Sequence, residues 1–291
     1  MHLRNLKVLP AAVLIAVLAC CLPALAEKKA EEAILIVAFG TSVEKARVSY
    51  ANVEKQVKGA FPGKEIRWAW TAHSLLKSSE GAAMLSPQEA LARLGTEGFK
   101  KVSVLSLHVI PGQEYSNLVE TAAAFEGLPK GLEEVQLSPP LLWDTDSMRV
   151  VAELLLKSVP KKRKAGEAVL FVGHGTHHPA GVYYPALQNY LNTSDPQAFV
   201  GTVEGDLDLA AVSKTLKMKG IKKVWLIPLM TVAGDHATND LFGDEADSWK
   251  QTLKAAGIAV EEVKMGLGEN PDLVSRWVKG LKAPKQEEKK D

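Results

Sequence analysis

Three side chains that could bind a metal ion follow three separate apolar segments in the second half of this sequence. His174 lies between two glycines, directly after the apolar run 169–172, and Glu204 and His236 follow later apolar segments. Two imidazoles and one carboxylate form a donor set that suits divalent cobalt, nickel, iron or zinc and leaves coordination positions open for exchange. The pattern therefore predicts a metal site formed by His174, Glu204 and His236, with coordination positions left open for exchange.

The segments that precede these residues are typical of strands in a parallel sheet. The run 169–172 is apolar without interruption and ends at glycine, as in a strand that is buried on both faces. Similar segments occur at 198–203 and 222–229, with helical patterns between them. Neighbouring parallel strands lie about 4.8 Å apart, and open α/β sheets bind ligands at the carboxyl ends of their strands. Residues that follow three such strands are therefore expected to meet.

Each of the three residues also has a purely structural interpretation. A lone histidine at a strand end is more often a capping or core residue than a metal ligand. Glu204 could cap the helix that begins near Leu207, and His236 could simply begin the next helix. The joint placement of all three favours the metal site. The sequence assigns no role to the other histidines considered, which are His73, His108, His177 and His178.

The two halves of the chain repeat one another. Residues 32–41 align with residues 167–176 without a gap, and residues 98–102 match residues 220–224 as Gly-x-Lys-Lys-Val. Strands and helices alternate in both halves, which indicates the α/β class. We therefore expect two similar halves related by internal duplication, each a parallel sheet of about four strands flanked by helices. Their predicted bounds are 27–150 and 151–281, with the metal site in the second.

The repeat also supplies an internal comparison for the predicted site. The alignment of the first strands places Phe39 opposite His174. The later match places Glu114 opposite His236, and the strand before His73 lies opposite the strand before Glu204. The first half therefore lacks the donor set of the second.

Local sequence patterns predict where two of the helices begin or end. Thr41 and Glu44 have the spacing of a capping box, and apolar residues continue at helical spacing to Ala60. In the second half, one long helix is expected over residues 238–255.

The first 26 residues have the pattern of a secretory signal. Two basic residues precede the apolar run 8–22, and Ala-Leu-Ala at 24–26 is a cleavage pattern. The run is shorter than the roughly 20 apolar residues that a membrane span needs. We expect export to the periplasm with cleavage after Ala26 and no stable membrane span; the alternative is a lipoprotein acylated at Cys20.

Composition and missing motifs exclude several classes of function. The 291 residues are 46% hydrophobic with a net charge of +1, which gives no reason to expect nucleic-acid binding. The glycines around His174 lack the spacing and the lysine of a phosphate loop, so no nucleotide is expected. No G-x-S-x-G elbow surrounds Ser42 or Ser74, so a serine hydrolase is not expected. Both cysteines precede Ala26, so a mature chain must bind metal through nitrogen and oxygen. The charged tail 282–291 is predicted to be disordered.

Several motifs together resemble those of the anaerobic cobalt chelatases of cobalamin synthesis, the sirohydrochlorin cobaltochelatases. This family belongs to the class II chelatases and is related to ferrochelatase. The resemblance covers nearly all of residues 32–281. Its motifs are Ile36-Val-Ala-Phe-Gly-Thr-Ser42, Leu107-His-Val-Ile-Pro-Gly-Gln-Glu-Tyr115, Gly173-His-Gly-Thr-His-His178, Val203-Glu-Gly205 and Gly234-Asp-His236.

The resemblance implies a function and assigns roles to residues. A tetrapyrrole would lie in a cleft between the two halves, and His174, Glu204 and His236 would bind the metal. His174 would also accept a pyrrole proton. The metal would be a substrate, with Co²⁺ expected and Fe²⁺ or Ni²⁺ compatible with the same donors. Cations such as Lys45 or Arg47 could bind the carboxylates of the macrocycle. A homo-oligomer is compatible with the sequence.

Export favours a second interpretation of the same site. Cobalamin synthesis is expected in the cytoplasm, whereas the signal pattern predicts a periplasmic protein. The protein could therefore be an exported metal or tetrapyrrole (haem) carrier that kept the fold and lost turnover. Repeated insertion of metal by one protein molecule would indicate a chelatase, whereas stoichiometric binding without turnover would indicate a carrier.

Overall fold

The computed structural model describes residues 31–77 and 84–282. The predicted signal sequence, the alternative acylation at Cys20 and all but the first residue of the predicted tail lie outside these residues and stay predictions. Within the described ranges, every helix is too short or too polar to cross a membrane.

The first half forms a four-stranded parallel sheet with β1 and β3 at its centre. The strand order is β2-β1-β3-β4. Its strands are β1 Glu32–Ala38, β2 Glu65–Trp70, β3 Lys101–Ser106 and β4 Glu134–Leu137. Its helical segments are η1 Glu44–Arg47, α1 Val48–Ala60, α2 His73–Leu76, α3 Pro87–Thr96 and α4 Gln113–Phe125.

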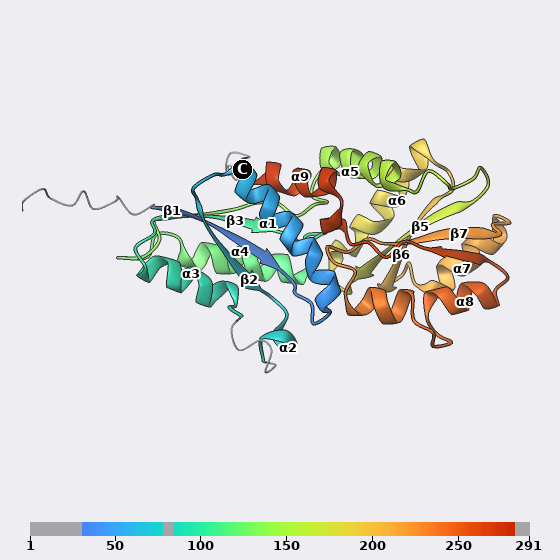
Figure 1. The fold of residues 1–291 in the computed structure, drawn as a ribbon, viewed down its shortest axis with the longest axis horizontal. Coiled ribbons are helices and arrows are strands. Elements are labelled where there is room, and N and C mark those ends of the chain that lie inside the picture. Colours follow the sequence, from blue (N-terminus) through green and yellow to red (C-terminus); the bar gives the residue numbers. More distant parts are fainter. Residues whose placement is uncertain (1–30, 78–83, 283–291) are drawn as a thin grey trace, which may run out of the picture. The chain divides into compact units, whose positions relative to one another are not determined.

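The second half repeats this sheet, with the order β6-β5-β7-β8. Its strands are β5 Ala168–Gly175, β6 Ala198–Glu204, β7 Lys223–Pro228 and β8 Ala259–Glu262. Its helical segments are η3 Pro179–Val182, α6 Tyr183–Ser194, α7 Leu209–Met218, η4 Ala237–Leu241 and α8 Trp249–Ala255. Helix α5, Thr145–Ser158, leads into this half, and η5 Leu267–Glu269 and α9 Pro271–Gly280 follow it. Figure 1 shows both sheets with helices alongside. The predicted fold class, two similar halves each with a four-stranded parallel sheet, is confirmed.

The central strands are buried on both faces, as their continuous apolar sequences predict. Alternate residues of β1 enter two different cores: Ile36 faces a cluster that also contains Phe171 of β5, whereas Leu35 faces a cluster of the first half alone. The residue before Phe171 on β5, Leu170, likewise faces a cluster of the second half. One face of each sheet therefore contributes to a core that the two halves share.

The last helix joins the two halves. Helix α9 packs against α1 and β3 of the first half and against α5, which in turn packs against α6 of the second half. Side-chain hydrogen bonds add to this packing: Thr231 donates to the carbonyl oxygen of Leu107 at 2.7 Å, and Tyr183 donates to that of Trp143 at 3.0 Å. The predicted boundary at residue 150 falls inside α5 and stays a prediction.

The expected capping box at Thr41 and Glu44 is wrong. The Thr41 hydroxyl accepts a hydrogen bond from the backbone N–H of Val43 at 3.1 Å, and a 3₁₀ turn begins at Glu44 without a side-chain cap. Thr41 instead lies close to Gly234 of the other half. The Thr41 hydroxyl therefore bonds the backbone before the turn, and the same residue approaches the other half.

The expected continuous helix over residues 238–255 is also wrong. A π-helical turn ends at Leu241, and α8 begins only at Trp249. At Gly243 a Cβ atom would lie 2.2 Å from the carbonyl oxygen of Asn239. The backbone at residue 243 therefore approaches that of Asn239 more closely than any residue with a side chain would allow. Ser248 then accepts from the backbone N–H of Gln251 and starts α8 as its N-cap.

Candidate active site

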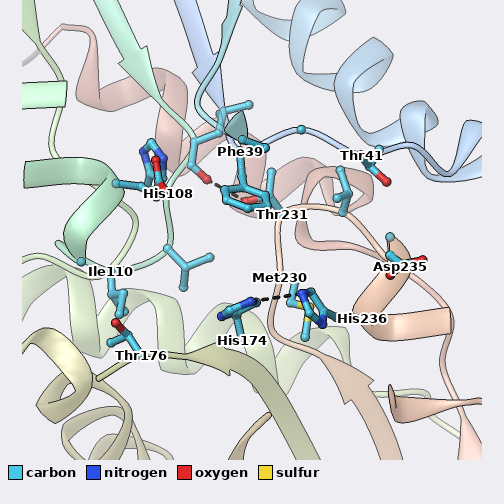
Figure 2. A pocket seen from close by; sticks show the side chains of 18 of the residues that line it. Phe39, Thr41, His108, Ile110, His174, Thr176, Met230, Thr231, Asp235 and His236 are labelled. Carbon is cyan, nitrogen blue, oxygen red and sulfur yellow. Dashed lines mark hydrogen bonds between the residues drawn. The ribbon is translucent and has the colours of Figure 1, made fainter. Parts of the chain in front are cut away.

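A cavity of about 910 Å³ lies where the carboxyl ends of strands from both sheets meet. This volume is near the upper end of the range of roughly 300 to 1,000 Å³ for small-molecule sites. The residues that follow β1 and β3 line it from the first half, and those at the ends of β5, β6 and β7 line it from the second. Figure 2 shows part of this lining, which includes Phe39, His108, His174, Thr231 and His236.

The structure brings His174 and His236 into direct contact across 62 positions of sequence. Their Nε2 atoms lie 3.1 Å apart, and the two ring planes are nearly perpendicular, at 86°. The dashed line in Figure 2 marks this contact. Two imidazole nitrogens that each lie about 2.1 Å from one ion, at a right angle, would be about 3.0 Å apart. The observed separation therefore suits two ligands of one metal ion.

The other nitrogen of each ring establishes which atom carries the proton. Nδ1 of His174 lies 3.1 Å from the carbonyl oxygen of Gly175, and Nδ1 of His236 lies 2.6 Å from a carboxylate oxygen of Asp240. Both partners are acceptors, so each Nδ1 donates a proton to its partner. With Nδ1 as the donor in both neutral rings, both Nε2 atoms are free to bind a cation; in the other tautomer of one ring, or with one ring protonated, the same separation suits a hydrogen bond between the rings. Such outer hydrogen bonds commonly orient metal-binding histidines.

The two glycines beside His174 are required by close contacts. Gly175 has a φ of +85°, and a Cβ atom there would lie 1.9 Å from the carbonyl oxygen of Glu204. At Gly173 a Cβ atom would lie 2.4 Å from the ring of Tyr184. The Tyr184 hydroxyl accepts a hydrogen bond from the N–H of Gly175, and burial raises its pKa to about 12. Strand β5 can therefore present His174 only with glycine on either side.

Glu204 lines the same cavity as the two histidines. It is the last residue of β6, is exposed, and pairs in register with Gly175. Within residues 31–77 and 84–282, however, no three His, Cys, Asp or Glu side chains are arranged so that they could hold one ion. Glu204 as the third metal ligand stays a prediction. Its alternative role as a helix cap is wrong, because Asp208 caps α7 and that helix begins at Leu209.

Sequence reasoning missed Asp240, which orients His236. Its position four residues after His236 was a usable signal, because side chains at this spacing meet on one face of a helical turn. His236 also begins η4 as its N-cap residue, so the structural interpretation of this histidine is correct as well. The local helix start and the contact with His174 are compatible.

The first-half counterparts of the three predicted ligands differ in their positions. Phe39 and Glu114 line the cavity. His73 starts the short helix α2 and does not belong to the cavity lining. The first half therefore presents an aromatic ring and a carboxylate to the cavity, and its imidazole counterpart lies elsewhere.

His108 is a further histidine of the cavity wall. Its Nδ1 lies 2.9 Å from the Ser106 hydroxyl, and its Nε2 is buried without a hydrogen-bond partner in the described part of the chain. The backbone carbonyl of His108 accepts from Leu141 and from the Trp277 indole, which hold the segment in place. Burial lowers the pKa of His108 to about 4, so the ring is neutral at neutral pH.

The depressed pKa of His108 predicts a loss of stability in weak acid. Above pH 6.5 the histidine is neutral in both folded and unfolded chains and has no effect; between pH 6.5 and 4 only the unfolded chain binds the proton. Over this window the free energy of unfolding should fall by about 3 kcal/mol more in wild type than in His108→Asn. Urea unfolding of both proteins at a series of pH values measures the difference. If the free energy of unfolding changed equally with pH in wild type and in His108→Asn, the pKa of His108 would not be lowered in the folded protein.

Comparison with known proteins places the sequence in a family. Residues 32–285 match the family model described as "Cobalt chelatase (CbiK)". The chain is 35% identical to sirohydrochlorin cobaltochelatase CbiKC of Nitratidesulfovibrio vulgaris over 255 residues, which cover 87% of this chain and 90% of the relative. It is 32% identical to sirohydrochlorin cobaltochelatase of Salmonella typhimurium over 255 residues, which cover 86% and 95%.

A solved structure agrees with this placement at the level of fold. SirB from Bacillus subtilis with Fe³⁺ superimposes with a TM-score of 0.57 at 15% identity, over 86% of this chain and 94% of SirB. The two-halved architecture is therefore shared with a structure of low sequence identity. On the extent of the family match and of both curated relatives, the chain belongs to the cobalt chelatase family.

Proposed function

We propose that this protein inserts a divalent metal ion into sirohydrochlorin, with Co²⁺ as the metal substrate. The observation that carries the proposal is the pair of Nε2 atoms of His174 and His236, 3.1 Å apart, in two rings whose Nδ1 atoms each lie beside an oxygen acceptor. A separation of this size suits two ligands of one ion and supports a cation position at the wall of a large cavity. Both curated relatives are named sirohydrochlorin cobaltochelatases, which supports this choice of macrocycle and metal.

The donor set explains how the ion could be transferred. Nitrogen and oxygen donors without thiolate hold Co²⁺ through exchangeable bonds, and Fe²⁺ or Ni²⁺ are compatible with the same donors. As the ion moves to the ring nitrogens, the Nε2 atoms of His174 and His236 are released. Each can then accept a proton.

The proton balance of insertion agrees with two imidazoles. A free tetrapyrrole loses two N–H protons when it binds a divalent ion, and imidazole is the side chain that exchanges protons near neutral pH. His174 is assigned as the first acceptor. The Asp240 carboxylate, 2.6 Å from Nδ1 of His236, stabilises the charge on that ring when it is protonated. Together the two rings can accept both protons that the macrocycle releases.

Turnover by the purified protein tests this proposal. Sirohydrochlorin in excess over protein is mixed with Co²⁺ without oxygen, and the absorption change of the macrocycle is followed against a protein-free control. We expect many equivalents of product for each protein chain. Binding of one equivalent without further product would contradict catalysis and favour the carrier interpretation. Parallel assays with Fe²⁺ and Ni²⁺ rank the metals.

A further inference from the structure

Phe39 is a large apolar side chain that the fold leaves exposed inside the cavity. It directly follows β1, 49% of its surface is accessible, and it lines the same cavity as His174 and His236. A phenyl ring packed in the core would be covered by protein atoms. Phe39 instead leaves about half of its surface accessible and forms part of the cavity lining.

The backbone holds Phe39 in place on both sides. Its carbonyl oxygen accepts a hydrogen bond from the N–H of Ala72 at 3.0 Å. The next residue, Gly40, has a φ of +114°, and a Cβ atom there would lie 2.5 Å from the Leu75 side chain. Only glycine fits this turn, so the direction in which the chain leaves β1 is restricted. The phenyl ring is therefore presented to the cavity by a constrained segment.

The internal duplication gives Phe39 the structural position that His174 has in the other half. β1 and β5 are the corresponding strands of the two sheets, and residues 32–41 and 167–176 align without a gap. Figure 2 shows the Phe39 ring on one side of the cavity and the imidazoles of His174 and His236 on the other. A flat ligand between them would meet nitrogen donors on one face and a phenyl ring on the other.

We propose that Phe39 is a positioning residue whose ring stacks on the face of the tetrapyrrole that lies away from His174 and His236. This inference rests on the proposed function for the identity of the macrocycle. A conjugated macrocycle is flat and apolar over its centre, and aromatic rings stack on such surfaces. Phenyl can neither bind the metal nor accept a proton, so Phe39 contributes only contact with the macrocycle, while the imidazole donors lie on the opposite face.

Substitutions at Phe39 test the inference through the binding of metal-free sirohydrochlorin, measured by absorbance titration. Phe39→Ala should raise the dissociation constant roughly 30-fold, because both apolar contact and stacking are lost. Phe39→Leu, which keeps an apolar side chain, should raise it roughly fivefold, and Phe39→Trp should stay within about twofold of wild type. The KM for the macrocycle should follow the same order. The affinity for Co²⁺ alone should not change.

Met218→Ala is the matched control, because Met218 on α7 is 76% exposed and does not line the cavity. It should bind the macrocycle as wild type does. Wild-type affinity in both Phe39→Ala and Phe39→Leu would overturn the stacking role, whatever the rate of metal insertion. Weakened binding in these variants with no turnover even in wild type would support the stacking role and contradict only the proposed catalysis. Failure of wild type to bind sirohydrochlorin would contradict both.

Discussion

His174→Ala is expected to lower the rate constant for Co²⁺ insertion by roughly 10² to 10⁴, the range for loss of a positioned acid–base group. The substitution removes one of the two nitrogens that face each other 3.1 Å apart, and with it the assigned proton acceptor. The remaining ring of His236, oriented by Asp240, then offers the ion a single imidazole nitrogen. Single-turnover absorbance measurements with excess protein separate the insertion step from product release.

Two controls make the result specific to the site. His177→Ala changes a histidine three positions away that is exposed and does not line the cavity, so its insertion rate should match wild type. Calorimetric titration should show weaker Co²⁺ binding by His174→Ala and unchanged binding by His177→Ala. An insertion rate equal to wild type in His174→Ala would remove this residue from the mechanism, and with it the proposed transfer from the histidine pair.

Gly175→Ala is expected to destabilise the protein by about 3 to 5 kcal/mol, or to prevent folding, because it combines backbone strain with a steric clash. The residue has a φ of +85°, and its added Cβ would lie 1.9 Å from the carbonyl oxygen of Glu204 on the neighbouring strand. That oxygen is backbone and cannot rotate away as a flexible side chain would. Strands β5 and β6 would have to separate where the site is formed. Urea unfolding followed by circular dichroism measures the loss.

Gly166→Ala separates the two causes. Gly166 has a similar φ of +88°, but a Cβ atom there would meet nothing within 4 Å. It should cost only the left-handed backbone conformation, about 1 to 2 kcal/mol. If Gly175→Ala and Gly166→Ala lose equal stability, the strands accommodate the methyl group and the contact with Glu204 does not matter. Insoluble Gly175→Ala beside soluble Gly166→Ala would agree with the expected difference.

Two local expectations failed, one beside a contact between the halves and one at a close approach of the backbone within a few residues. The spacing of Thr41 and Glu44 suits a capping box, yet Thr41 lies against Gly234 of the other half, and the helix begins differently. The helical pattern after residue 238 continues in sequence, but the chain breaks it after Leu241. Ser248, the cap that restarts the helix, was visible in the sequence, although helical periodicity alone did not reveal the break.

The class of fold and the positions of the site residues followed from the order of residues alone. Uninterrupted apolar runs such as 169–172 predict buried parallel strands, and the repeat predicts two such sheets. His174, Glu204 and His236 all line one cavity, as expected of residues at the carboxyl ends of neighbouring strands. These outcomes depend on strand spacing and periodicity, which are properties of the backbone.

Only the tertiary structure decided how the side chains meet. It placed Nε2 of His174 against Nε2 of His236 and left Glu204 in the cavity without a common position for one ion among the three described side chains. It also left Phe39 exposed on the other side of the cavity. Strand order brings residues to the same edge of a sheet, but side-chain rotation and the close backbone contacts at Gly173 and Gly175 determine which atoms touch. Those contacts join segments far apart in the chain, so sequence spacing carries no record of them.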